Sequence, residues 1–97
     1  MSTSVRQWDI GTWIEIDMDE DISAATDRKI HYRKPNAATG TWDASARTSD
    51  VIGYQTVDGD LDVPGTWHLQ GWCEFSSGAW TTVEVQLPVA RAIARVT

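Results

Sequence analysis

The stretch that decides the fold is residues 67–75, which read Trp-His-Leu-Gln-Gly-Trp-Cys-Glu-Phe. Its side chains alternate between a more apolar and a more polar set, and successive side chains of a β-strand point to opposite faces of a sheet. The apolar parity holds Trp67, Leu69, Cys73 and Phe75. The other parity holds His68, Gln70, Trp72 and Glu74. The stretch therefore predicts a half-buried strand, with Cys73 in the core and Trp72 on the outer face.

The residues after this stretch predict the second strand of a β-hairpin. Residues 81–89 alternate again, and the apolar parity holds Val83, Val85, Leu87 and Val89. The segment 76–80 between the two runs contains Gly78, and a short loop with glycine between alternating runs is typical of a hairpin. We therefore expect a hairpin with its loop at 76–80.

Shorter strands are predicted in the first half of the chain. Their alternating inward residues are Ile14, Ile16 and Met18; Ile30 and Tyr32; Trp42, Ala44 and Ala46; and Ile52, Tyr54 and Thr56. Turn sequences separate them at 36–40, 58–60 and 63–65, where glycine and proline favour reversals. No long helix is expected, and residues 22–27 are expected to form one turn. Six or seven short strands predict an all-β fold, an immunoglobulin-like β-sandwich of about seven antiparallel strands, with a small barrel as the alternative.

Length and charge limit the function classes. The 97 residues suffice for one domain, with an expected core at 9–89 and tails at 1–8 and 90–97. The net charge of −6 argues against a nucleic-acid partner, because binding to phosphates needs clustered Lys and Arg. No stretch of about 20 mainly apolar residues predicts a membrane span. No secretory signal is recognised, so we expect synthesis in a cytoplasm. Cys73 is the only cysteine, so an intrachain disulfide is excluded.

No motif for catalysis, a metal or a cofactor stands out. The acidic runs 17–21 and 58–62 lack the glycine and glutamate of a calcium-binding EF-hand loop, so they are interpreted as solvated faces. His31 and His68 are the only histidines, too few for a zinc site without help from Cys73, which is expected on another face. The basic residues 28–29 and 33–34 are interpreted as pairing with the acidic stretch before them. The sequence therefore predicts a protein that is not an enzyme and uses no cofactor.

Three stretches together carry a family resemblance. They are residues 9–12 (DIGT), residues 22–35 with the segments ISAAT and IHYRKP, and residues 59–70 with GDLD and PGTWHLQ. Their order resembles that of the N-terminal immunoglobulin-like domain of phage baseplate upper proteins, and it is also similar to short tailed-phage virion proteins. The resemblance implies a β-sandwich without catalysis, made in the host cytoplasm and located in the virion. The baseplate proteins continue into a second part, so capsid decoration, neck and tail or baseplate positions all remain open.

Two groups of residues are candidates for an interface. Trp72 is predicted on the outer face beside His68 and Gln70, where it would serve as a protein contact, as a platform for a sugar ring, or as a residue covered by a loop or the tail. The second group, in the tail, is Arg91, Ile93 and Arg95. This tail either extends the last strand of its own sandwich or docks on a neighbouring subunit as an added strand or a short helix.

Two functions therefore stay open. The first is a structural component of a phage particle that acts through assembly with other virion proteins or as a homo-oligomer. The alternative is a carbohydrate-binding module that attaches to a host glycan.

Overall fold

The computed structural model describes residues 5–82 and 84–91, and these residues form an all-β fold without a helix. The part of the chain so described thus offers no helix that could cross a membrane. In chain order the strands are β1 (Val5–Arg6), β2 (Trp13–Asp17), β3 (Asp27–Arg33), β4 (Thr39–Asp43), β5 (Ser45–Ala46), β6 (Val51–Gln55), β7 (Gly65–Phe75), β8 (Gly78–Thr81) and β9 (Val85–Ala90).

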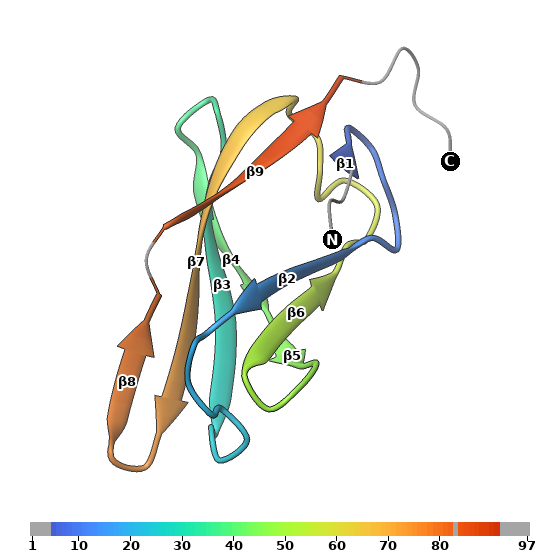
Figure 1. The fold of residues 1–97 in the computed structure, drawn as a ribbon. Helices are drawn as coiled ribbons and strands as arrows, with labels where there is room; N and C mark the ends of the chain where they lie inside the picture. The colour runs from blue at the N-terminus through green and yellow to red at the C-terminus, as the bar shows by residue number, and fades with distance from the viewer. Residues whose placement is uncertain (1–4, 83, 92–97) are drawn as a thin grey trace.

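The strands form two sheets that face each other and curl like half of a barrel (Figure 1). The larger sheet has the order β1-β9-β7-β3-β4, and β8 pairs with β7 beside β9. The smaller sheet has the order β2-β6-β5. All pairs are antiparallel except β1 with β9, which run parallel. The expectation that all strands pair antiparallel is therefore wrong for this one pair, whereas β9 pairs antiparallel with β7 on its other edge.

The long strand β7 organises the larger sheet, as its alternating sequence predicts. Trp67, Leu69 and Cys73 are buried, whereas His68, Gln70 and Trp72 are only partly buried on the other face. One edge of β7 pairs with β3, and the other edge pairs first with β9 and then with β8. The prediction that Cys73 lies in the core is confirmed, and burial raises the pKa of its thiol.

Aromatic rings from both sheets stack inside the core. Trp42 of β4 stacks on Tyr54 of β6 with ring centroids 4.9 Å apart, and Tyr32 of β3 lies 4.6 Å from Trp42 on centroids. Trp67 is fully buried, and its indole N–H donates to the carbonyl of Val63 at 2.8 Å. Rings that interlock in this way join the larger sheet to the smaller one.

The two sheets approach most closely at Gly71 of β7. A Cβ atom at this position would lie 2.6 Å from Sδ of Met18 and 3.2 and 3.3 Å from methyl groups of Ile16 and Ile52. Ile16 belongs to β2, Met18 follows directly after β2, and Ile52 belongs to β6. A side chain at position 71 would therefore push the sheets apart.

The strand expected at 81–89 is broken. β8 ends at Thr81 and β9 begins at Val85, and at the break the N–H of Thr82 donates to the carbonyl of Gly71 at 2.9 Å. The hydroxyl of Thr82 in turn accepts the N–H of Gly71 at 3.0 Å. The hairpin turn is also tighter than expected, because Phe75 pairs directly with Gly78. The loop predicted at 76–80 is thus reduced to two residues.

The strand expected around Trp42, Ala44 and Ala46 is divided between the two sheets. β4 ends at Asp43 in the larger sheet and β5 begins at Ser45 in the smaller one. The N–H of Ala44 donates to the carbonyl of Arg28 at 3.0 Å, so Ala44 marks the crossing point. The turn expected in 22–27 is present, since the N–H of Ala25 donates to the carbonyl of Ile22 at 3.1 Å.

The core begins earlier in the chain than the predicted limit of residue 9. Val5 is only 3% exposed and pairs with Val89, so it belongs to the core. The N–H of Gln7 donates to the carbonyl of Ala90 at 2.7 Å. Ala90 is consequently the last residue of β9, and the predicted tail at 90–97 starts one residue too early.

Tyr54 provides a test of the core's electrostatics. Burial, together with a hydrogen bond that its hydroxyl donates to Asp60 at 2.6 Å, raises the pKa of Tyr54 to about 12. Unfolded tyrosine ionises near pH 10, so the unfolded chain loses this proton first. We therefore expect the free energy of unfolding to fall as the pH rises from about 10 to 12. Phenolate absorbance, measured as the difference between the native chain and Tyr54→Phe, should appear near pH 12, and a difference already complete at pH 10 would contradict the assignment.

Candidate functional site

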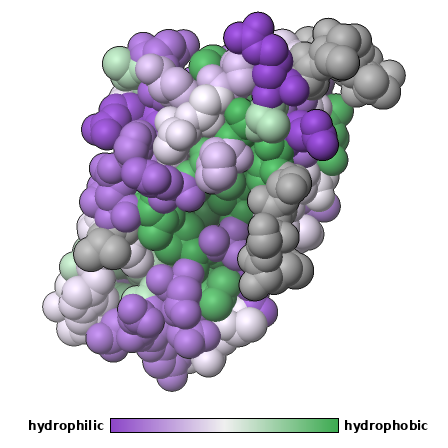
Figure 2. Space-filling view, turned by 45° about the horizontal axis from the view of Figure 1, so that its top comes forward, coloured by the Kyte–Doolittle hydropathy of each residue, from purple (hydrophilic) through white to green (hydrophobic). Residues whose placement is uncertain are grey.

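An apolar groove of about 670 Å³ opens where the two sheets part, between β2 and β9. In Figure 2 apolar side chains gather in a hollow in the middle of one face, with largely hydrophilic side chains around it. The groove is lined by Val5, Thr12, Trp13, Ile14, Glu15, Ile16, Asp17, Val51, Leu69, Val85, Gln86 and Leu87. Its size and its apolar floor make it the candidate site.

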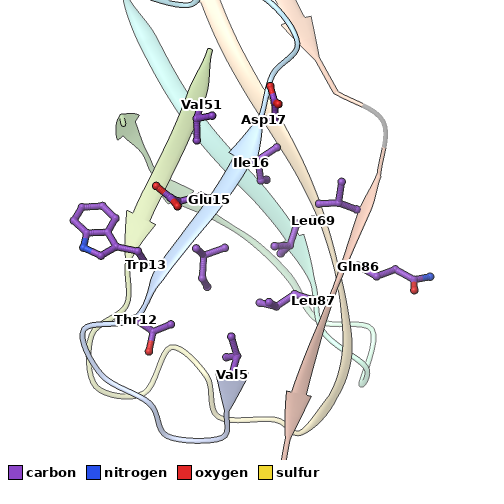
Figure 3. A pocket seen from close by; sticks show the side chains of 12 residues that line it. Val5, Thr12, Trp13, Glu15, Ile16, Asp17, Val51, Leu69, Gln86 and Leu87 are labelled. Carbon is purple, nitrogen blue, oxygen red and sulfur yellow. The ribbon is translucent and has the colours of Figure 1, made fainter. Parts of the chain in front are cut away.

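The floor of the groove comes from strand positions that face inward. Ile14 and Ile16 alternate along β2 with exposed residues, and Leu69 and Leu87 face them from β7 and β9. Figure 3 shows Ile16, Leu69 and Leu87 around the space between the strands, with Val5 at one end. Glu15 and Gln86 point outward on opposite sides. The groove is thus a part of the core that the two sheets leave uncovered.

The edge of β2 that faces this groove has no ladder partner among the described residues. On its other side, the N–H of Met18 donates to the backbone carbonyl of Asp50 at 2.7 Å, and the N–H of Thr56 donates to the backbone carbonyl of Thr12 at 2.9 Å. Bonded residues alternate along an antiparallel strand. The backbone N–H and C=O groups of Trp13, Glu15 and Asp17 therefore point away from β6, towards the open side.

The facing edge of β9 is much less available for pairing. Its last residues are covered by β1, through Val5 opposite Val89. The backbone carbonyl of Ala90 faces β1. Because the direction of the backbone groups alternates along a strand, those of Gln86 and Pro88 point to the same edge of β9. Pro88 has no N–H to donate, which is a common protection of edge strands. Of the two strands that border the groove, β2 is the one that offers a full set of backbone donors and acceptors.

Acidic residues and one tryptophan border the groove along β2. Glu15 and Asp17 are the charged residues among those that line it. Arg47 of the neighbouring loop binds Glu15, with Nε 3.0 Å from the carboxylate, and its guanidinium lies 3.8 Å from the ring centre of Trp13. Trp13 is 36% exposed. Asp17 accepts the N–H of Asp19 at 2.9 Å. Because Arg47 already pairs with Glu15, Asp17 is the carboxylate of this border that favours a ligand with positive charge.

The candidate residues on β7 lie together, but on the outer face of the larger sheet and away from the groove. Nδ1 of His68 is 2.6 Å from the carboxylate of Glu84, and Nε2 of Gln70 donates to the carbonyl of Thr82 at 3.4 Å. The ring of Trp72 is partly buried, with its centroid 6.3 Å from that of His31. Trp72 thus faces outward, as its parity predicts.

The tail candidates are only partly covered by the structure. Arg91 is exposed and follows directly after β9. Ile93 and Arg95 lie outside the described residues.

The predicted partners of the basic residues are different in the structure. Each of three basic side chains contacts a carboxylate that does not belong to the acidic run before them. The pairs are Lys29 with Asp43 at 2.6 Å, Arg33 with Glu84 at 3.8 Å and Lys34 with Asp62 at 2.8 Å. Lys29 also contacts Asp27, two residues before it, at 3.7 Å, and Arg28 donates to the carbonyl of Ile22 at 2.9 Å. Most of the basic patch is therefore paired with carboxylates that are close in space and distant in sequence.

The acidic runs form local turns. Asp21 accepts both the N–H and the hydroxyl of Ser23, which lowers the pKa of Asp21. Asp60 accepts the N–H of Val57 at 2.7 Å as well as the hydroxyl of Tyr54. Within residues 5–82 and 84–91, no three His, Cys, Asp or Glu side chains converge in a way that could hold a metal ion.

No family model, no curated protein and no solved structure matches this chain.

Proposed function

We propose that this protein is a non-enzymatic assembly module that takes up an extended strand of a partner protein in the groove between β2 and β9. The observation that carries the proposal is the position of the free edge of β2 beside an uncovered part of the core. Strand addition uses both features, because the backbone edge supplies hydrogen bonds and the pockets beside it select alternate side chains.

The charges on β2 favour one class of partner over self-pairing. Natural proteins protect exposed edges with charged side chains, and Glu15 and Asp17 stand on this edge. Two β2 strands side by side would bring these carboxylates together, which is unfavourable. A partner strand with cationic side chains on its outer face and apolar side chains on its inner face meets no such cost.

We further propose that the two facing sheets are an immunoglobulin-like sandwich and that the module is a structural component of a phage particle. Its support is the order of the segments DIGT, IHYRKP and PGTWHLQ together with the all-β architecture. Capsid decoration, neck and tail or baseplate are all compatible with a groove that receives a strand. In each of these places the partner would be another virion protein or a second copy of this chain.

A proline on the free edge tests the proposal. Because the N–H of Glu15 points away from β6, Glu15→Pro removes a donor from the open edge and leaves the ladder to β6 in place. The matched control Glu15→Gln removes the charge and keeps the N–H. The probe is a synthetic heptapeptide of alternating lysine and valine.

Hydrogen exchange measured by NMR gives the readout. We expect the peptide to slow exchange of the amides of Trp13 and Asp17 in the native chain, to do so more weakly in Glu15→Gln, and to have no effect in Glu15→Pro. Equal effects in all three proteins would mean that the peptide binds elsewhere. No effect in any of them, also after deletion of residues 91–97 so that this segment cannot compete for the groove, would overturn strand addition.

Glycan binding is the second candidate function, and it would use a different surface. A shallow hollow of about 190 Å³ on the outer face of the larger sheet is lined by hydrogen-bonding side chains that include His31, His68 and Gln70. Trp72 lies beside His31 on this face. If this surface binds sugar, Trp72→Ala should remove binding to a glycan array while the peptide still protects β2. Unchanged glycan binding in that variant would exclude this surface.

A further inference from the structure

We infer that the strand taken up by the groove is residues 91–97 of a second copy of this chain. The inference rests on the proposed function, since it names the partner for the same groove. Its grounds are the sequence pattern of this segment, the charges along β2 and the place where β9 ends.

The segment has the pattern that the groove requires. Residues 91–97 read Arg-Ala-Ile-Ala-Arg-Val-Thr. In an extended strand one parity holds Ala92, Ala94 and Val96, and the other holds Arg91, Ile93 and Arg95. The small apolar side chains of the first parity suit the floor formed by Ile14 and Ile16. The second parity then places two arginines on the outer face, next to the acidic side chains of β2.

The arginines of the added strand face the same two residues of β2 in either direction of that strand. With Ile93 opposite Glu15, one of the two arginines lies opposite Asp17 and the other lies opposite Trp13, whether the added strand is parallel or antiparallel. Opposite charges in directly facing positions stabilise a strand pair, so the arginine opposite Asp17 gains a partner. The ring of Trp13 already carries Arg47 at 3.8 Å, so the second arginine adds no charge pair there. Asp17 forms no ion pair with the residues that the structure describes, so its carboxylate is open to an arginine from outside.

The position of β1 favours a second copy over the chain's own tail. β9 ends at Ala90, and at this end β1 covers its edge, through Val5 opposite Val89 and the hydrogen bond from Gln7 to Ala90. Figure 1 shows β1 beside the end of β9, on the side of the smaller sheet. To reach its own groove, the tail would have to reverse direction beyond β1. Residues 91–97 contain no Gly, Pro, Asn or Asp, the residues that favour such a reversal.

Exchange of tails between two copies produces a closed pair. If each copy donates residues 91–97 and accepts the same segment, both grooves are filled and neither copy keeps an unpaired β2 edge. Such isologous pairing is the commonest form of symmetric assembly. The expected species in solution is therefore a dimer.

Disulfide trapping tests the identity of the strand. One chain carries Glu15→Cys and a second chain carries Ile93→Cys, and the native Cys73 stays in both because it is buried. After mild oxidation we expect a mixed dimer joined between positions 15 and 93, identified by mass spectrometry. The matched control replaces Glu15→Cys by Thr81→Cys, an exposed position on β8, and should give no such product.

The double variant Glu15→Cys with Ile93→Cys separates the possible sources of the strand. Disulfides between chains support a second copy, whereas a disulfide within one chain shows that the chain's own tail fills the groove and overturns the inference. If no disulfide forms, and deletion of residues 1–4 is needed before the lysine–valine peptide binds, the N-terminal residues are the occupant and the inference is again wrong.

Light scattering after gel filtration completes the test. We expect the native chain to be a dimer, and we expect deletion of residues 91–97 to give a folded monomer. Glu15→Pro should weaken the dimer about tenfold or more, through loss of an edge hydrogen bond in the partner strand pair. A native chain that stays monomeric while the lysine–valine peptide still binds β2 would refute the second copy and leave the proposed function standing. If the native chain is a monomer and the lysine–valine peptide does not bind β2 either, both the second copy and the proposed function are refuted.

Discussion

Replacing Trp67 by alanine is expected to lower the free energy of unfolding by about 3–5 kcal/mol. Trp67 is 0% exposed, and its ring lies 5.5 Å from Tyr32 and 5.9 Å from Trp42 on centroids. The variant also leaves the carbonyl of Val63 without its indole donor. Since domains of this kind are stable by only about 5–15 kcal/mol, the loss would bring the chain near its unfolding limit.

Trp80 is the matched control for this prediction. It lies on β8, is 52% exposed and contacts Phe75 edge to face at 4.5 Å between centroids. Because about half of its surface stays exposed, Trp80→Ala should cost clearly less than Trp67→Ala, about 1–2 kcal/mol. Urea unfolding followed by circular dichroism compares the two variants without relying on tryptophan fluorescence. Similar losses in both would mean that Trp67 does not hold the sheets together.

A methyl group at Gly71 is expected to lower the free energy of unfolding by about 1–3 kcal/mol. The added Cβ would lie 2.6 Å from Sδ of Met18, within the closest contact between the sheets. Met18 is buried, so Met18→Ala alone should cost about 2–5 kcal/mol through the cavity that it leaves. In the double variant the new methyl group occupies part of this cavity.

A double-mutant cycle measures the contact directly. The combined loss in Gly71→Ala with Met18→Ala should be smaller than the sum of the two single losses by about 0.5–3 kcal/mol. Urea unfolding of the four proteins gives the coupling. Strictly additive losses would show that the sheets are not in contact at this point.

Local alternation predicted the parts of the fold in which one face of a strand is buried. Ile14, Ile16 and Met18 are buried as expected, and so are Trp67 and Leu69. Such patterns carry the inward direction of each side chain and nothing about which strand lies beside it. This is why the outward position of Trp72 was predictable, whereas the partners of the basic residues were not.

The parts that could not be predicted depend on single contacts far apart in the chain. The alternation of 81–89 runs on through the break, because the break is set by the hydrogen bonds between Thr82 and Gly71. β1 has only two residues, too few for any period to be visible. Val5 therefore gives no signal in the sequence that it belongs to the core.

The groove was missed for the same reason, since its two borders come from opposite ends of the chain. Ile14, Ile16 and Leu87 were expected to be inward, and they are, but nothing in a local pattern shows that the space above them stays uncovered. One signal was available. A proline within an alternating run, as at Pro88, is typical of an edge strand. It indicates an open side of the sheet without showing what lies across from it.

The parallel pairing of β1 with β9 also determines when the molecule can be completed during its synthesis. Val5 is made early, but its partner Val89 follows 84 residues later (89 − 5). At about 5–20 residues per second on the ribosome, this interval lasts about 4–17 s. Until β9 is made, Val5 has no strand to pair with and the groove lacks its second border, since Val85, Gln86 and Leu87 line it from β9. The nascent chain therefore passes through a stage in which Ile14 and Ile16 of β2 have no strand across from them.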